Sequence, residues 1–302
     1  MPWQSNKLLM INKNNLAVIS LIFSASLWGL IWYPLRLLNE AGLSAVWSSL
    51  IMYLAAGVLA LPALYKHRQY LLKIPANLTA LALAAGITNV AFVVALIDGE
   101  VMRVMLLFYL SPLWTVLLGR WWLGETLSSH AMLMFIIAMC GLMVVLWNPA
   151  MGWPWPNNIA EWLALLASIA FSINNVLARK LADVPMGIKT GVIWWGVVIV
   201  SVLVLVWQQT ATPDVTATVW LSAWLLGALG IVTMTIAVLY GVGKMPVYRS
   251  AVIMLFELVV AAIAAWYLTD EVMTIQVWIG GGLILLAGYG VSLEDKFGEI
   301  ND

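Results

Sequence analysis

The sequence predicts an all-α integral membrane protein with ten transmembrane helices, arranged as two inverted five-helix repeats. Three observations support this fold class. The 302-residue chain is 64% hydrophobic and 9% charged, whereas soluble domains are about 45–50% apolar and about 25% charged. The apolar residues gather in runs long enough to cross a bilayer, which takes about 20 residues. One long run also occurs twice in the chain.

The duplicated run covers 101–125 and 247–271, and each copy has an arginine near its start and an acidic residue just past its end. The matched pairs are Val101 with Val247, Arg103 with Arg249, and Glu125 with Glu271. A second match places 26–40 over 169–183, with Arg36 on Arg179. Two matches in the same order predict an internal duplication, and such a duplication decides the architecture.

We expect ten spans, numbered in chain order and joined by short connections. They cover 16–37, 43–64, 76–97, 101–123, 130–147, 159–181, 187–207, 218–240, 246–268 and 274–293. If the spans alternate in direction, all of the 14 Lys and Arg residues except Arg36 and Arg103 fall on one side. Basic residues gather on the cytoplasmic side of membrane proteins. Both termini are therefore expected to be cytoplasmic, in a bacterial inner membrane.

The repeat divides the chain into a first half, 1–150, and a second half, 151–302. Because five spans is an odd number, span 1 starts on the inside and span 6 starts on the outside. The two halves therefore run in opposite directions, as in the inverted repeats of secondary transporters. We expect the two halves to form one transport unit.

The composition argues against several other classes of protein and site. The formal net charge is zero, so nucleic acid is not an expected partner. Cys140 is the single cysteine, which excludes a disulfide or a cysteine metal site within one chain. The two histidines form no ligand cluster, and the sequence contains no nucleotide-binding motif and no nucleophile–base pair. We expect no cofactor, no metal and no enzymatic activity.

Several short motifs resemble a known family. They are LWG in span 1, YLSPLWT with Pro112 in span 4, and WLGET with Glu125 at the end of that span. Together they resemble the EamA-type members of the drug/metabolite transporter superfamily. The resemblance implies ten helices in two inverted halves, a central cavity lined mainly by spans 1, 3, 4, 6, 8 and 9, and transport of amino acids or other small metabolites. In the second half Leu258 follows Glu257 where the family has proline, so we expect a straighter span 9.

Glu257 is the main candidate for a functional residue, because it lies near the middle of span 9. A carboxylate at this depth is costly and marks function by default. It suits either a proton-coupled step or contact with a substrate amine. The structural alternative is a protonated glutamate that bonds to a neighbouring helix. Arg249, eight residues earlier on the same expected helical face, favours the functional interpretation.

Other candidates for substrate binding are aromatic or polar residues deep in the spans: Trp28, Trp32, Asn89, Trp114, Asn174 and Asn175. Asparagine amides need hydrogen-bond partners in hydrocarbon, so each of them either faces a cavity or binds a neighbouring helix. An aromatic cage for a substrate cation is one interpretation of the tryptophans, and packing is the simpler one. Most of the 18 tryptophans are expected at the membrane interfaces.

Four arginines are candidates for gating and form two symmetric pairs. Arg36 and Arg103 lie on the expected outside, and Arg179 and Arg249 on the inside. The inner pair also fits the positive-inside rule, but the outer pair violates it. An ion pair with Glu40, Asp98 or Glu100, or attraction of an anionic substrate group, would offset that penalty. The alternative is snorkelling of the two side chains to the interface.

Glycines at 280–282, 288 and 290, together with Gly141, predict that spans 10 and 5 pack closely on another helix. The resemblance places these spans at the periphery or between protomers, so a homodimer is one of the alternatives.

The leading interpretation is a secondary active or facilitative transporter of a small polar metabolite, such as an amino acid exporter, with alternating access and bound lipid. The alternative is an intramembrane enzyme or a non-transporting receptor. An enzyme would need clustered titratable groups, and Glu257 is nearly alone in the spans.

Overall fold

The computed structural model describes residues 3–99, 101–146, 155–268 and 274–292. Within these ranges every regular element is a helix. Nine described helical segments are apolar and long enough to cross a membrane, and Ile275–Val291 is a shorter apolar helix. The all-α membrane fold expected from the sequence is confirmed, because each expected span corresponds to one helix or to consecutive helices.

The first half of the chain contains spans 1 to 5, and a short helix, α4 (Gln69–Lys73), joins spans 2 and 3. The spans are α1 (Trp3–Leu30) with α2 (Trp32–Glu40), α3 (Ala45–Lys66), α5 (Pro75–Asp98), α6 (Val101–Phe108) with α7 (Ser111–Leu118) and the π-helix η1 (Gly119–Leu123), and α8 (Ser129–Leu146).

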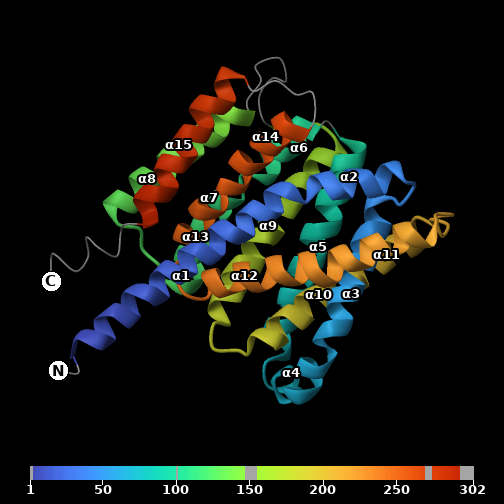
Figure 1. The fold of residues 1–302 in the computed structure, drawn as a ribbon, viewed down its shortest axis with the longest axis horizontal. Coiled ribbons are helices and arrows are strands. Elements are labelled where there is room, and N and C mark those ends of the chain that lie inside the picture. The colour runs from blue at the N-terminus through green and yellow to red at the C-terminus, as the bar shows by residue number, and fades with distance from the viewer. Residues whose placement is uncertain (1–2, 100, 147–154, 269–273, 293–302) are drawn as a thin grey trace.

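The second half contains spans 6 to 10 in the same succession. They are α9 (Ile159–Lys180), α10 (Met186–Trp207), α11 (Ala217–Leu225) with the π-helix η3 (Leu226–Ile231) and α12 (Val232–Val242), α13 (Val247–Met254) with α14 (Phe256–Leu268), and α15 (Ile275–Ser292). In Figure 1 the end of α3 lies toward the bottom and the end of α12 toward the left, whereas the end of α2 and the start of α11 lie toward the right. This arrangement separates the expected inner helix ends from the expected outer ones.

The two halves exchange their first spans. Helix α1 packs against α12, α13 and α14 of the second half, and α9 packs against α5, α6 and α7 of the first half. Two bundles result, each built from both halves: bundle A consists of α5, α6, α7 and α9, and bundle B consists of α1, α12, α13 and α14. The same exchange in both directions is the pattern expected of inverted repeats related by a pseudo-twofold axis.

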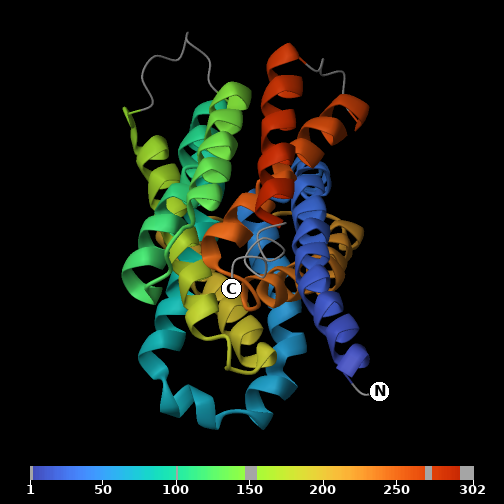
Figure 2. The same ribbon diagram turned by 90° about the vertical axis from the view of Figure 1, so that its left-hand side faces the viewer.

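The remaining spans pair with their repeat equivalents. Helix α3 packs against α10, and α8 packs against α15. Figures 1 and 2 show the α8–α15 pair at the end of the molecule opposite α3 and α4. A Cβ atom added to Gly280 would lie 2.5 Å from the carbonyl oxygen of Gly141, so the close packing expected of spans 5 and 10 is confirmed.

Span 4 is interrupted between α6 and α7, at Tyr109 and Leu110. Pro112 explains the interruption, because its ring has no N–H and clashes with the carbonyl group four residues earlier. Span 9 is interrupted at Leu255, between α13 and α14. The repeat alignment places Leu255 on Tyr109, so the two interruptions are equivalent.

The expectation that Leu258 would make span 9 straighter is therefore not met. The interruption forms without proline, through tight i→i−3 hydrogen bonds: the Leu255 N–H donates to the Val252 carbonyl at 3.2 Å, and the Leu258 N–H donates to the Leu255 carbonyl at 3.1 Å. Such 3₁₀-type bonds end one helical segment before the next begins.

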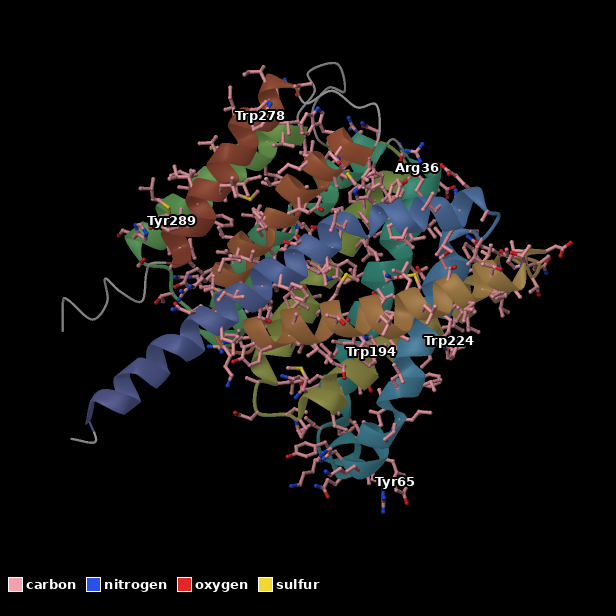
Figure 3. The ribbon with its side chains drawn as sticks, viewed as in Figure 1. Arg36, Tyr65, Trp194, Trp224, Trp278 and Tyr289 are labelled. Carbon is pink, nitrogen blue, oxygen red and sulfur yellow. The ribbon has the colours of Figure 1, made fainter. Side chains whose placement is uncertain are left out.

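Aromatic side chains at the outer surface of the bundles agree with interfacial positions. Trp121, Trp155 and Trp278 are exposed, and Figure 3 shows Trp278, Tyr289 and Tyr65 pointing away from the helices. Amphipathic rings of this kind gather at the headgroup level of membranes.

Candidate functional site

A small cavity lies between bundles A and B, where the two interrupted spans meet. Its volume is about 30 Å³, and its walls come from the end of α6, from α7, α9, α13 and α14, and from the end of α12. A water molecule needs about 10–15 Å³ of such space. The cavity therefore has room for about two water molecules and is too small for a larger solute. The side chains that give this central cavity its chemistry are Phe108, Tyr109, Phe171, Asn175, Ser250 and Glu257.

A hydrogen bond joins the two interruptions across the cavity. The phenolic O–H of Tyr109 donates to Oε1 of Glu257 at 2.5 Å. Tyr109 directly follows α6, and Glu257 lies in the first turn of α14. A carboxylate is favoured there by the partial positive charge at a helix N-terminus. This bond connects bundle A to bundle B at the level where both spans are interrupted.

Contacts with α9 hold the interrupted part of span 4 in place. The Ser172 hydroxyl donates to the carbonyl oxygen of Ser111 at 2.8 Å. The ring centroids of Phe108 and Phe171 are 5.6 Å apart, and those of Phe108 and Tyr109 are 5.5 Å apart in an edge-to-face arrangement. Three aromatic rings therefore form one wall of the cavity, facing Glu257 on bundle B.

Glu125 closes the side of the molecule that is expected to face the cytoplasm, called the inner side. Gly124 has a φ of 68°, a left-handed conformation that glycine adopts without strain, and it turns the chain after η1. Oε2 of Glu125 accepts a hydrogen bond from the Val247 N–H at 2.8 Å, and Oε1 lies 3.4 Å from Nε of Arg179. Nη1 of Arg179 also donates to the carbonyl oxygen of Gly243 at 2.9 Å.

These four residues, Glu125, Arg179, Gly243 and Val247, form what we call the inner latch. Arg179 lies in α9 of bundle A and Glu125 directly follows the end of span 4, whereas Gly243 and Val247 lie where bundle B passes from span 8 to span 9. The bonds to Val247 and Gly243 therefore connect the two bundles. With the latch formed, the inner ends of spans 4, 6, 8 and 9 are held together below the central cavity.

Arg103 lies at the opposite, outer end of bundle A. Its Nε is 2.7 Å from Oε1 of Glu161, and the side chains of the two residues are only 6% and 4% exposed. Nη2 of Arg103 also donates to the carbonyl oxygen of Trp155 at 2.6 Å. The ion pair joins α6 to the first turn of α9, so it fastens two helices of the same bundle.

Glu161 was not among the expected partners of Arg103, which were Glu40, Asp98 and Glu100. A signal for it existed in the sequence, because Asn158 and Glu161 have the spacing of a helix capping box before an apolar run. The structure forms this cap: the Glu161 N–H donates to Oδ1 of Asn158 at 2.9 Å. Glu100, and the repeat counterpart of Glu125 at Glu271, lie outside the described residues.

Arg36 does form an ion pair with Glu40, at 2.9 Å, but both residues belong to α2 and both side chains are 56% exposed. Figure 3 shows Arg36 on the side of α2 turned away from α11. In this structure the pair cannot hold two helices together. Arg249 is buried in α13 at 4% exposure and does not line the central cavity.

Of the expected substrate-binding residues, Asn175 and Glu257 line the cavity. Asn89 donates from Nδ2 to the Tyr53 hydroxyl at 3.4 Å, which is the helix-bonding alternative for an amide. Four other expected residues lie elsewhere in the spans: Trp28, Trp32, Trp114 and Asn174. Their roles stay predictions, as do those of the four arginines. Sequence reasoning missed Phe108, Tyr109 and Phe171 as cavity residues.

Comparisons with known proteins agree with this architecture. The model of the EamA-like transporter family matches residues 15–147 and 158–293. Curated relatives include Protein RarD of Salmonella typhi and of Salmonella typhimurium strain LT2, each 25% identical over 153 residues, or 49% of this chain. The match spans 48% of each relative, about half of its length. A solved crystal structure of a protein superposes with a TM-score of 0.74 at 18% identity, over 92% of this chain and 96% of that one, which shows the fold alone.

Proposed function

Because this chain belongs to the EamA-like transporter family, whose members move small solutes across membranes, we propose that it is a secondary transporter of a small polar metabolite. The substrate is an amino acid or a related metabolite, and export across the bacterial inner membrane is the proposed direction. Both termini face the cytoplasm. Energy comes from a solute or proton gradient.

The observation that carries the proposal is the Tyr109–Glu257 hydrogen bond between two interrupted spans. Interrupted helices near the middle of the membrane are where secondary transporters place their substrate sites. Here the two interruptions are equivalent in the repeat, face one cavity, and contribute groups from opposite bundles. A solute bound between Tyr109 and Glu257 would therefore respond to any movement of bundle A against bundle B.

The inner latch supports alternating access as the mechanism. Its bonds connect the same two bundles that the Tyr109–Glu257 bond connects, at the inner end instead of the middle. We propose that the structure represents a state closed toward the cytoplasm, and that opening requires Glu125 to release Val247 and Arg179 to release Gly243. The halves 1–150 and 151–302 act as one transport unit, because each bundle contains helices of both.

Transport accounts for the cavity better than intramembrane catalysis does. Glu257 bonds to the Tyr109 phenol, whereas the Ser250 hydroxyl donates to the Val247 carbonyl at 3.0 Å. Among the described residues that line the cavity, the carboxylate is therefore not arranged to activate a serine, as a nucleophile–base pair requires.

The test is solute counterflow in proteoliposomes. Purified protein is reconstituted with a high internal concentration of one unlabelled amino acid or amine at a time, and entry of the labelled solute is followed. We expect transient accumulation for at least one solute, its loss in Glu257→Gln, and its retention in Glu40→Gln, which removes an exposed carboxylate of α2. Absence of counterflow across amino acids, amines and sugars, with folded protein present, would contradict the proposal.

A further inference from the structure

We infer that the substrate of the central cavity is a small organic monocation, an amine without a carboxylate, and that Glu257 binds its positive charge. This inference rests on the proposed transport function and narrows its substrate class. It follows from the charges, the aromatic wall and the helix termini around the cavity.

The ionisable groups of the cavity wall are one carboxylate and one phenol. Glu257 and Tyr109 line the cavity, and the described lining residues include no Lys, Arg or His. A carboxylate away from water needs a compensating partner. An ammonium group supplies both a charge and N–H donors, and charge-assisted hydrogen bonds are about twice as strong as neutral ones.

The aromatic wall suits the rest of such a solute. Phe108, Tyr109 and Phe171 line the cavity together, and Phe92 adds a fourth ring behind them, with its centroid 4.3 Å from that of Phe108. Ring faces attract cations within about 6 Å of the centroid. The wall therefore offers apolar contact for a hydrocarbon group and attraction for a positive charge, and none of its four side chains carries a positive charge for an anion.

An anionic group would find no counter-charge here. Arg179 is held in the inner latch by Glu125 and the Gly243 carbonyl, and Arg103 is held at the outer end by Glu161. Neither lines the cavity. The carboxylate of an amino acid would therefore enter a cavity whose described lining residues include the carboxyl group of Glu257 and no basic side chain.

The N-terminus of α7 could also attract an anion, but three of its first four residues offer it no free amide. Pro112 has no N–H. The Leu113 and Trp114 N–H groups both donate to the Leu110 carbonyl, at 2.9 and 3.4 Å. The N-terminus of α14 carries Glu257 itself in its first turn. The N-termini of α7 and α14 therefore do not turn the preference of the cavity from a cation to an anion.

Tyr109 competes with the substrate for Glu257 in the closed state. Its phenol holds the carboxylate at 2.5 Å, and the cavity of about 30 Å³ is too small for an organic amine. The amine must displace the phenolic O–H as the bundles separate. Removing that hydroxyl while keeping the ring should therefore strengthen binding of the amine.

The test uses three probes with one hydrocarbon skeleton: phenethylamine, a monocation; phenylalanine, a zwitterion; and 2-phenylethanol, a neutral molecule. Binding to the purified full-length protein is measured by isothermal titration calorimetry, and counterflow of each probe is measured in proteoliposomes. We expect phenethylamine to bind at least about tenfold more tightly than either other probe, the ratio expected when one charge-assisted contact is lost. Glu257→Gln should abolish that preference, and Tyr109→Phe should increase phenethylamine affinity severalfold. Glu40→Gln is the matched control and should change nothing.

The inference is overturned if phenylalanine binds as tightly as phenethylamine, if Glu257→Gln retains the preference, or if none of the three probes binds. Its failure is distinguishable from failure of the transport proposal. Counterflow of phenylalanine or of another zwitterion without that of phenethylamine would reject the cation site and keep the transporter. Absence of counterflow for every solute would reject the transporter as well.

Discussion

The contacts of the inner latch predict how far one substitution, Glu125→Gln, should shift the equilibrium between the closed and open states. Replacing Glu125 by glutamine keeps the shape of the side chain and an oxygen for the Val247 N–H, but removes the negative charge. The ion pair with Arg179 is lost, and the bond from Val247 at 2.8 Å becomes a neutral hydrogen bond. We expect the equilibrium to move toward the state that is open on the inner side.

The expected change in the free-energy difference between the closed and open states has two contributions. Hydrogen bonds to charged groups contribute about 1.5–3 kcal/mol and neutral ones about 0.5–1.5 kcal/mol, so this exchange removes about 1 kcal/mol. The Arg179–Glu125 pair is 3.4 Å apart, with side chains 29% and 16% exposed, and a pair of this kind adds about 0.5 kcal/mol. The total of about 1.5 kcal/mol corresponds to a shift of about tenfold in the equilibrium.

The assay is the reaction of a cavity cysteine with a membrane-impermeant maleimide. Ala251 lines the cavity and is replaced by cysteine, and the exposed Cys140 is replaced by serine. In inside-out vesicles, Glu125→Gln should raise the labelling rate at position 251 about tenfold. Glu40→Gln, which breaks only the exposed pair on α2, should leave the rate within about twofold. An unchanged rate in Glu125→Gln would refute the latch.

Three further predictions concern stability and orientation. Glu161→Gln leaves Arg103 buried without its counter-charge and should lower the free energy of unfolding by about 3 kcal/mol; an unchanged denaturation midpoint in detergent would contradict this. Gly280→Ala should destabilise the α8–α15 pair, because the new methyl group meets a backbone carbonyl at 2.5 Å, whereas Gly288→Ala, with nothing within 4 Å, should not; equal melting temperatures would remove the packing explanation. A cysteine in place of Lys66 should react with the impermeant maleimide only from the cytoplasmic side, and labelling of intact cells from outside would reverse the proposed orientation.

The fold was predictable because its signals are local and repeated. The length of each apolar run predicts a membrane span. The matches of Arg36 with Arg179 and of Arg103 with Arg249 predict the internal duplication. Pro112 predicts an interruption by removing a hydrogen bond. The interruption at Leu255 has no such signature in the residue types, although the repeat alignment places it on Tyr109. Exchange of the first spans between the halves depends on packing that no single span encodes.

The site was predictable only in part. Glu257 stands out because a carboxylate in hydrocarbon is costly. Its partner Tyr109 does not stand out, because a single tyrosine in an apolar run is compatible with any membrane-spanning helix. Arg179 and Glu125 were each singled out, but their pairing depends on the left-handed turn at Gly124. Conversely, Trp28 was expected at the site from its depth, and the structure packs it against the hydrophobic core, where an aromatic ring is equally stable.

The central claim is that one cavity between the two bundles opens to each side of the membrane in turn. The most direct test is the reaction of the Ala251→Cys variant, in the Cys140→Ser background, with the impermeant maleimide applied separately to right-side-out and inside-out vesicles. The account predicts that the same cysteine is labelled from both sides, and that Glu125→Gln raises the inner rate while lowering the outer one. Labelling from one side alone, in both variants and under solute gradients of either direction, would contradict it.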